Sequence, residues 1–191
     1  MTRAAVFLDR DGTLNQERGY LDRIDMLALF PWTADAVRLL NRAGFATVVV
    51  TNQAAVARGL IDEPFLHRVH AELDARLAAG GARIDRYYYC PHLEDGPEGP
   101  FRQRCECRKP RPGMIETAAR DLDLDLSRSA MVGDRWLDVQ CARAAGVRAV
   151  LVRSGHGGRE AEVPGPGVEA DAILNNLMEA VGWILRSSSR W

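Results

Sequence analysis

The chain has 191 residues, 47% hydrophobic and 27% charged, which predicts one soluble domain, residues 1–191, whose core is large enough to need no disulfides. A formal net charge of −1 excludes the strongly basic field of nucleic-acid-binding proteins, and no apolar run reaches the roughly 18 residues of a membrane span. The first strand is predicted almost directly after Met1, so we expect no signal peptide and a cytoplasmic protein. We also expect a monomer that binds neither nucleic acid nor membrane.

Strands and helices are predicted to alternate along the first half of the chain. An apolar run predicts a buried strand over residues 4–8, and a helix follows over residues 33–44. A β-branched run predicts a second strand over residues 45–51. A long helix over residues 62–81 and a third strand over residues 83–90 complete this half.

The second half begins with a loop over residues 91–112 that is rich in Gly, Pro and charge. A helix over residues 113–122, a strand over 129–133, a helix over 136–146 and a strand over 147–152 are predicted next. The remaining predicted elements are a loop over 162–170, a helix over 173–186 and a frayed end over 187–191.

Helix boundaries are predicted from residues with special capping chemistry. Thr33 and Asp62 are expected as N-caps, because a side-chain oxygen can accept a hydrogen bond from a free N–H group of the first turn. Gly44 is expected just past the end of the first helix, and Gly80 and Gly81 at the end of the second.

The alternation of elements predicts the fold class. Strands that read as continuous apolar runs between helices predict an α/β fold, a Rossmann-like parallel sheet with helices on both faces and no large cap domain. Ligands of such sheets bind at the carboxyl ends of the strands.

Two aspartates, Asp9 and Asp11, follow the first predicted strand and are separated by one residue. An Asp-Gly turn of a hairpin would explain them, but no alternating strand follows. A divalent cation between the carboxylates would offset their repulsion, and Mg²⁺ prefers such oxygen ligands. Asp9 is then placed to attack phosphorus as a nucleophile, with Asp11 as general acid and base.

Other polar residues are predicted at the same rim of the sheet. The second strand ends in Thr51, whose hydroxyl is followed by the amides of Asn52 and Gln53. Asp134 and Asp138 follow the fourth strand, although aspartates are also common where a helix begins. Lys109 supplies a positive charge for this group of polar and acidic residues.

Three cysteines and a histidine bracket the loop over residues 90–107. Four such ligands fill a tetrahedral site, so we expect a structural Zn²⁺ on Cys90, His92, Cys105 and Cys107. The zinc would order a loop that has few apolar residues and would fix the segment that carries Arg108 and Lys109. Cys141, among alanines of a predicted helix, is expected in the core.

The segments "FLDRDGTLN", "VVVTNQ", "CRKP" and "MVGDRWLD", in this order, resemble the four motifs of the haloacid dehalogenase-like phosphohydrolases. The resemblance covers roughly residues 4–153. It implies an aspartyl-phosphate mechanism in which Asp9 is the nucleophile and Asp11 the general acid/base, while Thr51 and Lys109 steady the phosphoryl group. It also implies a Mg²⁺ held by Asp9, the main-chain carbonyl of Asp11, and Asp134.

The cysteine loop resembles one branch of that family, which contains heptose bisphosphate 7-phosphatases and histidinol-phosphate phosphatases. The length of the stretch over residues 93–104 and the "CRKPRPGM" run resemble the heptose enzymes more than the histidinol enzymes. A sugar bisphosphate is therefore the expected substrate, and histidinol phosphate is the alternative. The substrate residues that the resemblance implies are Gly19, Tyr20, Thr51, Asn52, Gln53, Arg108, Lys109 and Arg135.

The chain departs from the pattern of the heptose enzymes at two places. Ala54 and Ala55 stand where Ser-Gly is usual, and Arg135 stands where lysine is common. A non-enzymatic alternative is a receiver-like domain that accepts a phosphoryl group without turnover. Such a domain would need neither the second aspartate nor the cysteine loop.

Overall fold

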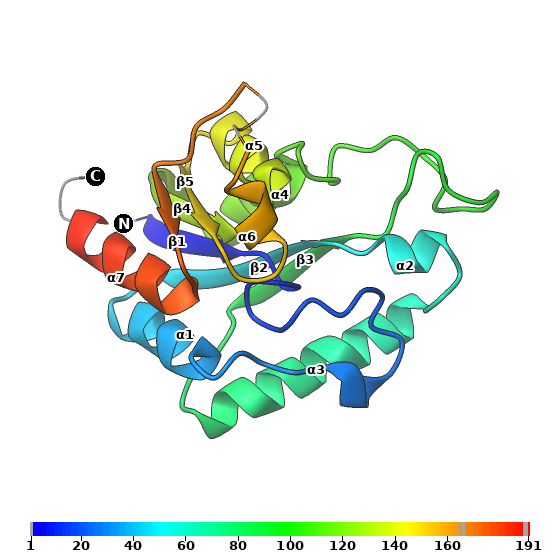
Figure 1. Cartoon of the computed structure of the whole chain (residues 1–191), viewed down its shortest axis with the longest axis horizontal. Helices are drawn as coiled ribbons and strands as arrows, with labels where there is room; N and C mark the ends of the chain where they lie inside the picture. The colour runs from blue at the N-terminus through cyan, green and yellow to red at the C-terminus, as the bar shows by residue number, and fades with distance from the viewer. Residues whose placement is uncertain (1, 164, 166, 189–190) are drawn as a thin grey trace.

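A parallel β-sheet of six strands forms the centre of the molecule in the computed structural model, which describes residues 2–163, 165, 167–188 and 191 (Figure 1). The strands lie in the order β3-β2-β1-β4-β5-β6. Every neighbouring pair of these strands is parallel. Their bounds are β1 Arg3–Leu8, β2 Ala46–Asn52, β3 Arg86–Cys90, β4 Leu124–Gly133, β5 Arg148–Val152 and β6 Ala172–Leu174.

Helices cover both faces of this sheet (Figure 1). One face packs against α1 Thr33–Arg42, α3 Glu63–Ala79 and α7 Leu177–Ser187. The other packs against α4 Gly113–Leu122 and α5 Trp136–Ala144. Three short helical segments complete the described elements: η1 Ile24–Met26, α2 Ala54–Ala57 and α6 Gly157–Glu160.

The first strand shows how the sequence builds two cores. Val6 and Leu8 pack into the core beneath α1, α3 and α7, whereas Ala5 and Phe7 pack into the core beneath α4 and α5. All four side chains are fully buried because successive residues of a strand point to opposite faces. The predicted parallel sheet with helices on both faces is therefore confirmed.

The sheet order also explains where a ligand site arises. The chain runs outward from β1 through β2 to β3, then returns to β4 on the other side of β1. The connections after β1 and β4 thus diverge, which opens a crevice at the carboxyl ends of these two strands.

Most predicted boundaries agree with the structure. Asp62 caps α3 and accepts a hydrogen bond from the N–H of Phe65, and Gly44 follows the end of α1 with a φ of +87°. Cys141 is buried as expected. Within the described residues, no helix combines the length and the apolar character that crossing a membrane would require.

Four sequence predictions were wrong or incomplete. Thr33 is the first residue of α1, not its cap, because its hydroxyl donates to the carbonyl of Leu14 at 2.6 Å. The fourth strand begins at Leu124 instead of residue 129. The predicted helix over 173–186 is a strand followed by α7, whose cap is Asn176. The short helices α2 and α6 were not predicted.

Two further predictions fall partly outside the described residues. In the predicted loop over 162–170, positions 164 and 166 are not described. In the predicted frayed end, positions 189 and 190 are not described, and Ser187 is the last residue of α7.

Candidate active site

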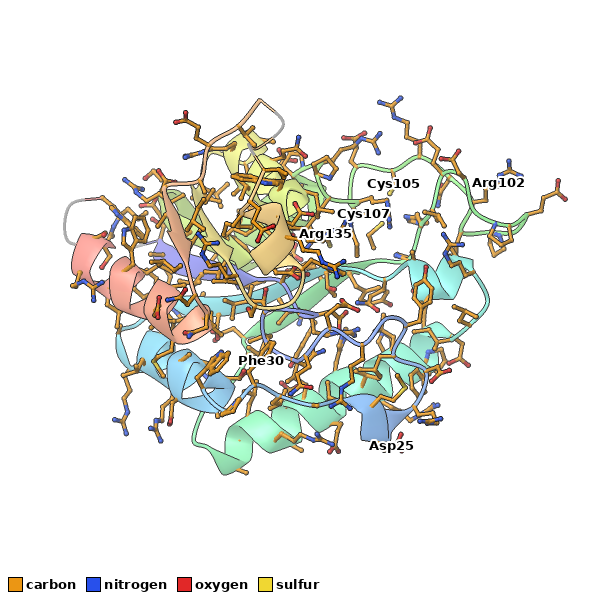
Figure 2. The ribbon with its side chains drawn as sticks, viewed as in Figure 1. Asp25, Phe30, Arg102, Cys105, Cys107 and Arg135 are labelled. Atoms are coloured by element: carbon orange, nitrogen blue, oxygen red, sulfur yellow. The ribbon has the colours of Figure 1, made fainter. Side chains whose placement is uncertain are left out.

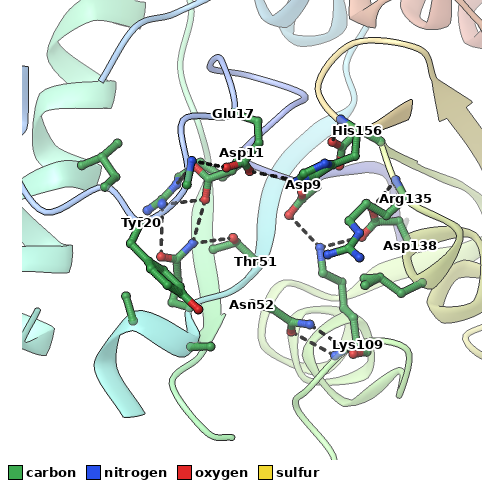
Figure 3. Close-up of a pocket in the computed structure, with 18 of the residues that line it drawn as sticks. Asp9, Asp11, Glu17, Tyr20, Thr51, Asn52, Lys109, Arg135, Asp138 and His156 are labelled. Atoms are coloured by element: carbon green, nitrogen blue, oxygen red, sulfur yellow. Dashed lines mark hydrogen bonds and ion pairs between the residues drawn. The ribbon is translucent and has the colours of Figure 1, made fainter. Parts of the chain in front are cut away.

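A cavity of about 320 Å³ lies at the carboxyl ends of β1, β2 and β4 (Figure 3). Its walls come from the segments that follow these strands, from the residue 108–109 segment, and from the loop after β5. The cavity brings together all the residues predicted for catalysis, substrate and Mg²⁺: Asp9, Asp11, Gly19, Tyr20, Thr51, Asn52, Gln53, Arg108, Lys109, Asp134 and Arg135.

Lys109 is a buried cation at the base of the cavity. Its Nζ atom lies 2.7 Å from Oδ1 of Asp9 and 2.7 Å from Oδ1 of Asp138, and it donates to the carbonyl of Val50 at 2.9 Å. Burial opposes its positive charge, but the two carboxylates outweigh burial and raise the pKa of Lys109. Lys109 therefore stays protonated and holds one oxygen of Asp9 in place.

Asp9, Asp134 and Asp138 form a buried acidic cluster whose carboxylates each bring an oxygen within 4.8 Å of the others. Burial, partly opposed by Lys109, raises the pKa of Asp9 to about 7. Burial and the charges of Asp9 and Asp138 raise the pKa of Asp134 to about 8. Three carboxylates thus share one ammonium, and a divalent cation would balance the remaining charge.

The donor atoms of this cluster fit such a cation. Asp138 is engaged by Lys109 and by the N–H of Arg135. Asp134 accepts the N–H of His156 on Oδ2 at 2.7 Å, while its Oδ1 is buried and finds no hydrogen-bond partner in the part of the chain that the structure describes. An orphaned carboxylate oxygen beside Asp9 suits Mg²⁺, which takes oxygen ligands.

Two glycines allow this close packing around Asp134. A Cβ atom on Gly12 would lie 2.1 Å from Oδ2 of Asp134, and one on Gly155 would lie 2.2 Å from the same oxygen. Gly12 also has a φ of +82°, which side-chain-bearing residues rarely adopt. The glycine after Asp11 in the first motif is thus required by space and by backbone conformation.

Asp11 lies in a separate polar network on the side of Thr51 and Tyr20 (Figure 3). Its carboxylate accepts hydrogen bonds from Arg10, from Nδ2 of Asn15 at 2.9 Å and from Nε2 of Gln53 at 3.0 Å. Burial opposes its ionisation, but Arg10 and these hydrogen bonds outweigh burial and lower the pKa of Asp11.

The polar residues at the end of β2 line the cavity and also hydrogen-bond to neighbouring residues. The amide of Asn52 bonds both main-chain groups of Lys109, accepting its N–H at 3.0 Å and donating to its carbonyl at 3.1 Å. Gln53 donates to Oγ1 of Thr51 at 2.8 Å. Because the Thr51 oxygen accepts this bond, its own O–H is available to donate to a phosphoryl oxygen.

The rim of the cavity carries charged and aromatic side chains. Tyr20 is 47% exposed, and the guanidinium of Arg58 stacks on its ring at 5.8 Å from the centroid. Arg108 donates one N–H to the carbonyl of His92 at 3.0 Å. Arg135 lies 3.6 Å from Glu160.

Sequence reasoning missed three charged or titratable residues that line the cavity, Arg10, Glu17 and His156. Arg10 was passed over although it lies between the two aspartates, because charge alone does not reveal burial. Glu17 and His156 approach each other to 3.8 Å from loops that follow different strands. Their proximity depends on the sheet order, so no local sequence pattern predicts it.

The cysteine loop brings its four predicted ligands together, and it extends beside the sheet with Cys105 and Cys107 near its base (Figure 2). The sulfur of Cys105 lies 3.4 Å from that of Cys90 and 3.3 Å from that of Cys107. Nδ1 of His92 lies 3.3 Å from the Cys107 sulfur and 3.8 Å from that of Cys90. A tetrahedral zinc with bonds of about 2.0–2.3 Å spaces its ligands by roughly 3.5–3.8 Å, so the cluster fits Zn²⁺.

The second half of the chain matches a known family model. Residues 106–180 match the model for HAD-hydrolase-like proteins. This segment includes Lys109, Asp134 and Asp138.

Curated relatives resemble nearly the whole chain. A D-glycero-D-manno-heptose-1,7-bisphosphate 7-phosphatase of Thermosynechococcus vestitus is 44% identical over 189 residues, which cover 96% of each chain. The D-glycero-beta-D-manno-heptose-1,7-bisphosphate 7-phosphatase of Yersinia pestis is 42% identical over 176 residues, which cover 92% of each chain.

A solved structure with the same architecture is also similar. The D,D-heptose 1,7-bisphosphate phosphatase from B. bronchiseptica, crystallised with magnesium and phosphate, superposes with a TM-score of 0.86 at 33% identity. The match covers 96% of this chain and 99% of that one.

Proposed function

Because this chain belongs to the haloacid dehalogenase-like phosphatases, we propose that it removes the 7-phosphate of a D-glycero-D-manno-heptose 1,7-bisphosphate. Membership of this family makes it a phosphoric monoester hydrolase. The observation that carries the proposal is the buried Lys109–Asp9 contact at the base of a polar cavity, with an acidic cluster beside it.

Asp9 is the nucleophile in this proposal. Lys109 engages Oδ1 of Asp9, so we assign Oδ2 as the oxygen that attacks phosphorus. The new O–P bond forms as the bond from phosphorus to the sugar oxygen breaks, which gives an aspartyl-phosphate and the free alcohol. Thr51 donates to a phosphoryl oxygen, and the positive charge of the buried Lys109 ammonium stabilises the charge on the phosphoryl group.

Asp11 moves the protons of both half-reactions. As an acid it gives a proton to the departing sugar oxygen. Because Arg10, Asn15 and Gln53 favour the carboxylate, Asp11 takes up this proton from water before the transfer. As the resulting carboxylate it then takes a proton from the water that attacks the aspartyl-phosphate. The second step releases inorganic phosphate and restores Asp9.

Two metal ions are part of the proposal. Asp9, the main-chain carbonyl of Asp11, and Asp134 would hold Mg²⁺, which when bound would neutralise charge on the cluster and on the phosphoryl group. The ligand set Cys90, His92, Cys105 and Cys107 would hold a structural Zn²⁺. The Mg²⁺ assignment is supported by the magnesium and phosphate in the similar B. bronchiseptica enzyme.

The rim residues supply selection for a bisphosphate. Arg108 donates one N–H to the carbonyl of His92. This hydrogen bond anchors the guanidinium to the cysteine loop and leaves its other N–H donors for an anion. A guanidinium can bind the distant 1-phosphate through two parallel hydrogen bonds. Gly19, Tyr20, Asn52, Gln53 and Arg135 would form the rest of the substrate-binding wall.

Histidinol phosphate is the alternative substrate, and a direct comparison tests the proposal. The far end of histidinol phosphate is cationic and would be repelled by Arg108. We expect kcat/KM for the heptose bisphosphate to exceed that for histidinol phosphate by about one to two powers of ten. A clear preference for histidinol phosphate would overturn the substrate assignment and leave the phosphatase chemistry in place. Phosphorylation without turnover would instead support the receiver-like alternative.

A further inference from the structure

Arg10 is a charged residue in a place that normally excludes charge. It is 2% exposed and ranks among the largest fully buried side chains of the described residues. A buried guanidinium is tolerated only where close partners compensate for the water it has lost. Its closest partner is the next residue in the chain, Asp11.

The guanidinium of Arg10 engages both oxygens of Asp11. Its Nε atom donates to Oδ1 at 3.1 Å and its Nη2 atom donates to Oδ2 at 2.7 Å. Two donors in a rigid planar fork fix the plane of a carboxylate as well as its position. A single flexible ammonium could hold the charge of Asp11 but not its plane.

Gln53 extends this contact to the phosphate-binding side of the cavity. Its Oε1 accepts Nη2 of Arg10 at 3.1 Å, and its Nε2 donates to Oδ2 of Asp11 at 3.0 Å and to Oγ1 of Thr51 at 2.8 Å. Arg10 and Gln53 therefore link Asp11 to the Thr51 hydroxyl, the proposed donor to the phosphoryl group.

Stability alone does not account for this arrangement. A buried ion pair is often no more stabilising than apolar side chains of similar volume. In addition, Nη1 of Arg10 is buried and has no hydrogen-bond partner among the described residues, which is costly. The network lies beside the reacting atoms, where the orientation of a proton donor matters most.

We propose that Arg10 is a positioning residue whose guanidinium, supported by Gln53, holds the Asp11 carboxyl group in the orientation for proton transfer. Arg10 acts through Asp11 and does not itself bind the substrate. The inference rests on the proposed phosphatase reaction, in which Asp11 gives its proton to the leaving sugar oxygen as the O–P bond breaks.

The dependence on the leaving group tests this role. A sugar oxygen needs a proton as it leaves, whereas 4-nitrophenolate leaves without one, and kcat/KM reports only the steps up to the aspartyl-phosphate. For Arg10→Lys we expect kcat/KM on the heptose bisphosphate to fall about 10- to 100-fold, and on 4-nitrophenyl phosphate less than about threefold. The matched variant Arg38→Lys, in a surface ion pair with Asp35, should change neither value. Equal losses on both substrates would overturn the proposal, because they indicate a general structural effect.

A double-mutant cycle separates action through Asp11 from independent effects. In an Asp11→Asn background, Arg10→Lys should cause no further loss on the heptose bisphosphate, and multiplying losses would overturn the proposal. If Arg10→Lys does not fold, Asn15→Ala removes another donor to Asp11 at a residue that does not line the cavity, and it should show the same leaving-group selectivity at about 3- to 10-fold. If the wild-type enzyme rejects the heptose bisphosphate, the proposed substrate fails, and the same comparison is made with the sugar phosphate that it does hydrolyse.

Discussion

Nζ of Lys109 lies 2.7 Å from Oδ1 of Asp9, although the two residues are 100 positions apart in the chain. The contact forms because Asp9 directly follows β1, while the main chain of Lys109 is held by the side chain of Asn52 at the end of β2. The amine of a segment outside the sheet is thus brought to the carboxylate of the central strand. The catalytic assignments depend on this juxtaposition.

Replacing the nucleophile should abolish turnover without unfolding the protein. In Asp9→Asn, we expect kcat to fall by about 10⁴-fold or more, because an amide cannot form the aspartyl-phosphate. The fold should persist, since Asp138 still pairs with Lys109. Steady-state kinetics and circular dichroism check both expectations, and near-normal turnover would show that the covalent mechanism is wrong.

The cysteine cluster should hold one zinc per chain. Elemental analysis of protein purified without added metal is expected to find it, and Cys107→Ser should lose it together with much of the activity, because the Arg108–Lys109 segment follows directly. Cys141→Ser, which changes a buried thiol outside the cluster, should keep the metal. A zinc-free wild-type protein together with a fully active Cys107→Ser variant would refute the structural zinc.

Arg108 should govern selection for the bisphosphate. In Arg108→Ala, kcat/KM on the heptose bisphosphate is expected to fall about 10- to 100-fold, because a charge-assisted hydrogen bond contributes roughly 1.5–3 kcal/mol. The loss on a simple monophosphate should be much smaller. Arg104→Ala, an exposed arginine of the same loop that does not line the cavity, serves as control. Parallel losses on both substrates would rule out a contact with the distant phosphate.

His70 should make the folded protein less stable as the pH falls. Burial, with the charge of Arg10 adding to it, lowers the pKa of His70 to about 3, so the unfolded chain binds a proton below about pH 6.5 that the folded protein does not. This single group should reduce the free energy of unfolding by about 1 kcal/mol between pH 6.5 and pH 5.5.

The variant His70→Phe isolates this effect. The imidazole stacks on the ring of Tyr87 with centroids 4.4 Å apart, and phenylalanine can keep that packing without a titrating group. Urea unfolding at pH 7.5, 6.5 and 5.5 should show wild type losing stability relative to the variant as the pH falls. A difference that does not change with pH would contradict the burial of a neutral His70.

The sequence predicts the sheet and much of the site because both follow from strand ends. Asp9, Thr51 and Asp134 each lie at or directly after the carboxyl end of a strand, and parallel strands bring such ends together. The positions of Lys109 and the zinc ligands came from motif resemblance and ligand chemistry instead.

The missed features depend on tertiary contacts. β6 has three residues and forms by pairing with β5, which local periodicity does not reveal. Thr33 has the chemistry of an N-cap, yet its hydroxyl bonds to Leu14 in a distant loop. The burial of Arg10 depends on Asp11 and Gln53 in the folded cavity, and arginine in a sequence is ordinarily read as a surface residue.

In the proposed reaction, Asp9 takes the phosphoryl group from position 7 of the sugar. Rapid acid quench of the enzyme with heptose 1,7-bisphosphate carrying ³²P at position 7, followed by peptide mapping, tests it most directly. We expect label on the peptide that contains Asp9, no label in Asp9→Asn, and unlabelled phosphate retained at position 1 of the product. Turnover with no labelled peptide, or release of the phosphate at position 1, would contradict it.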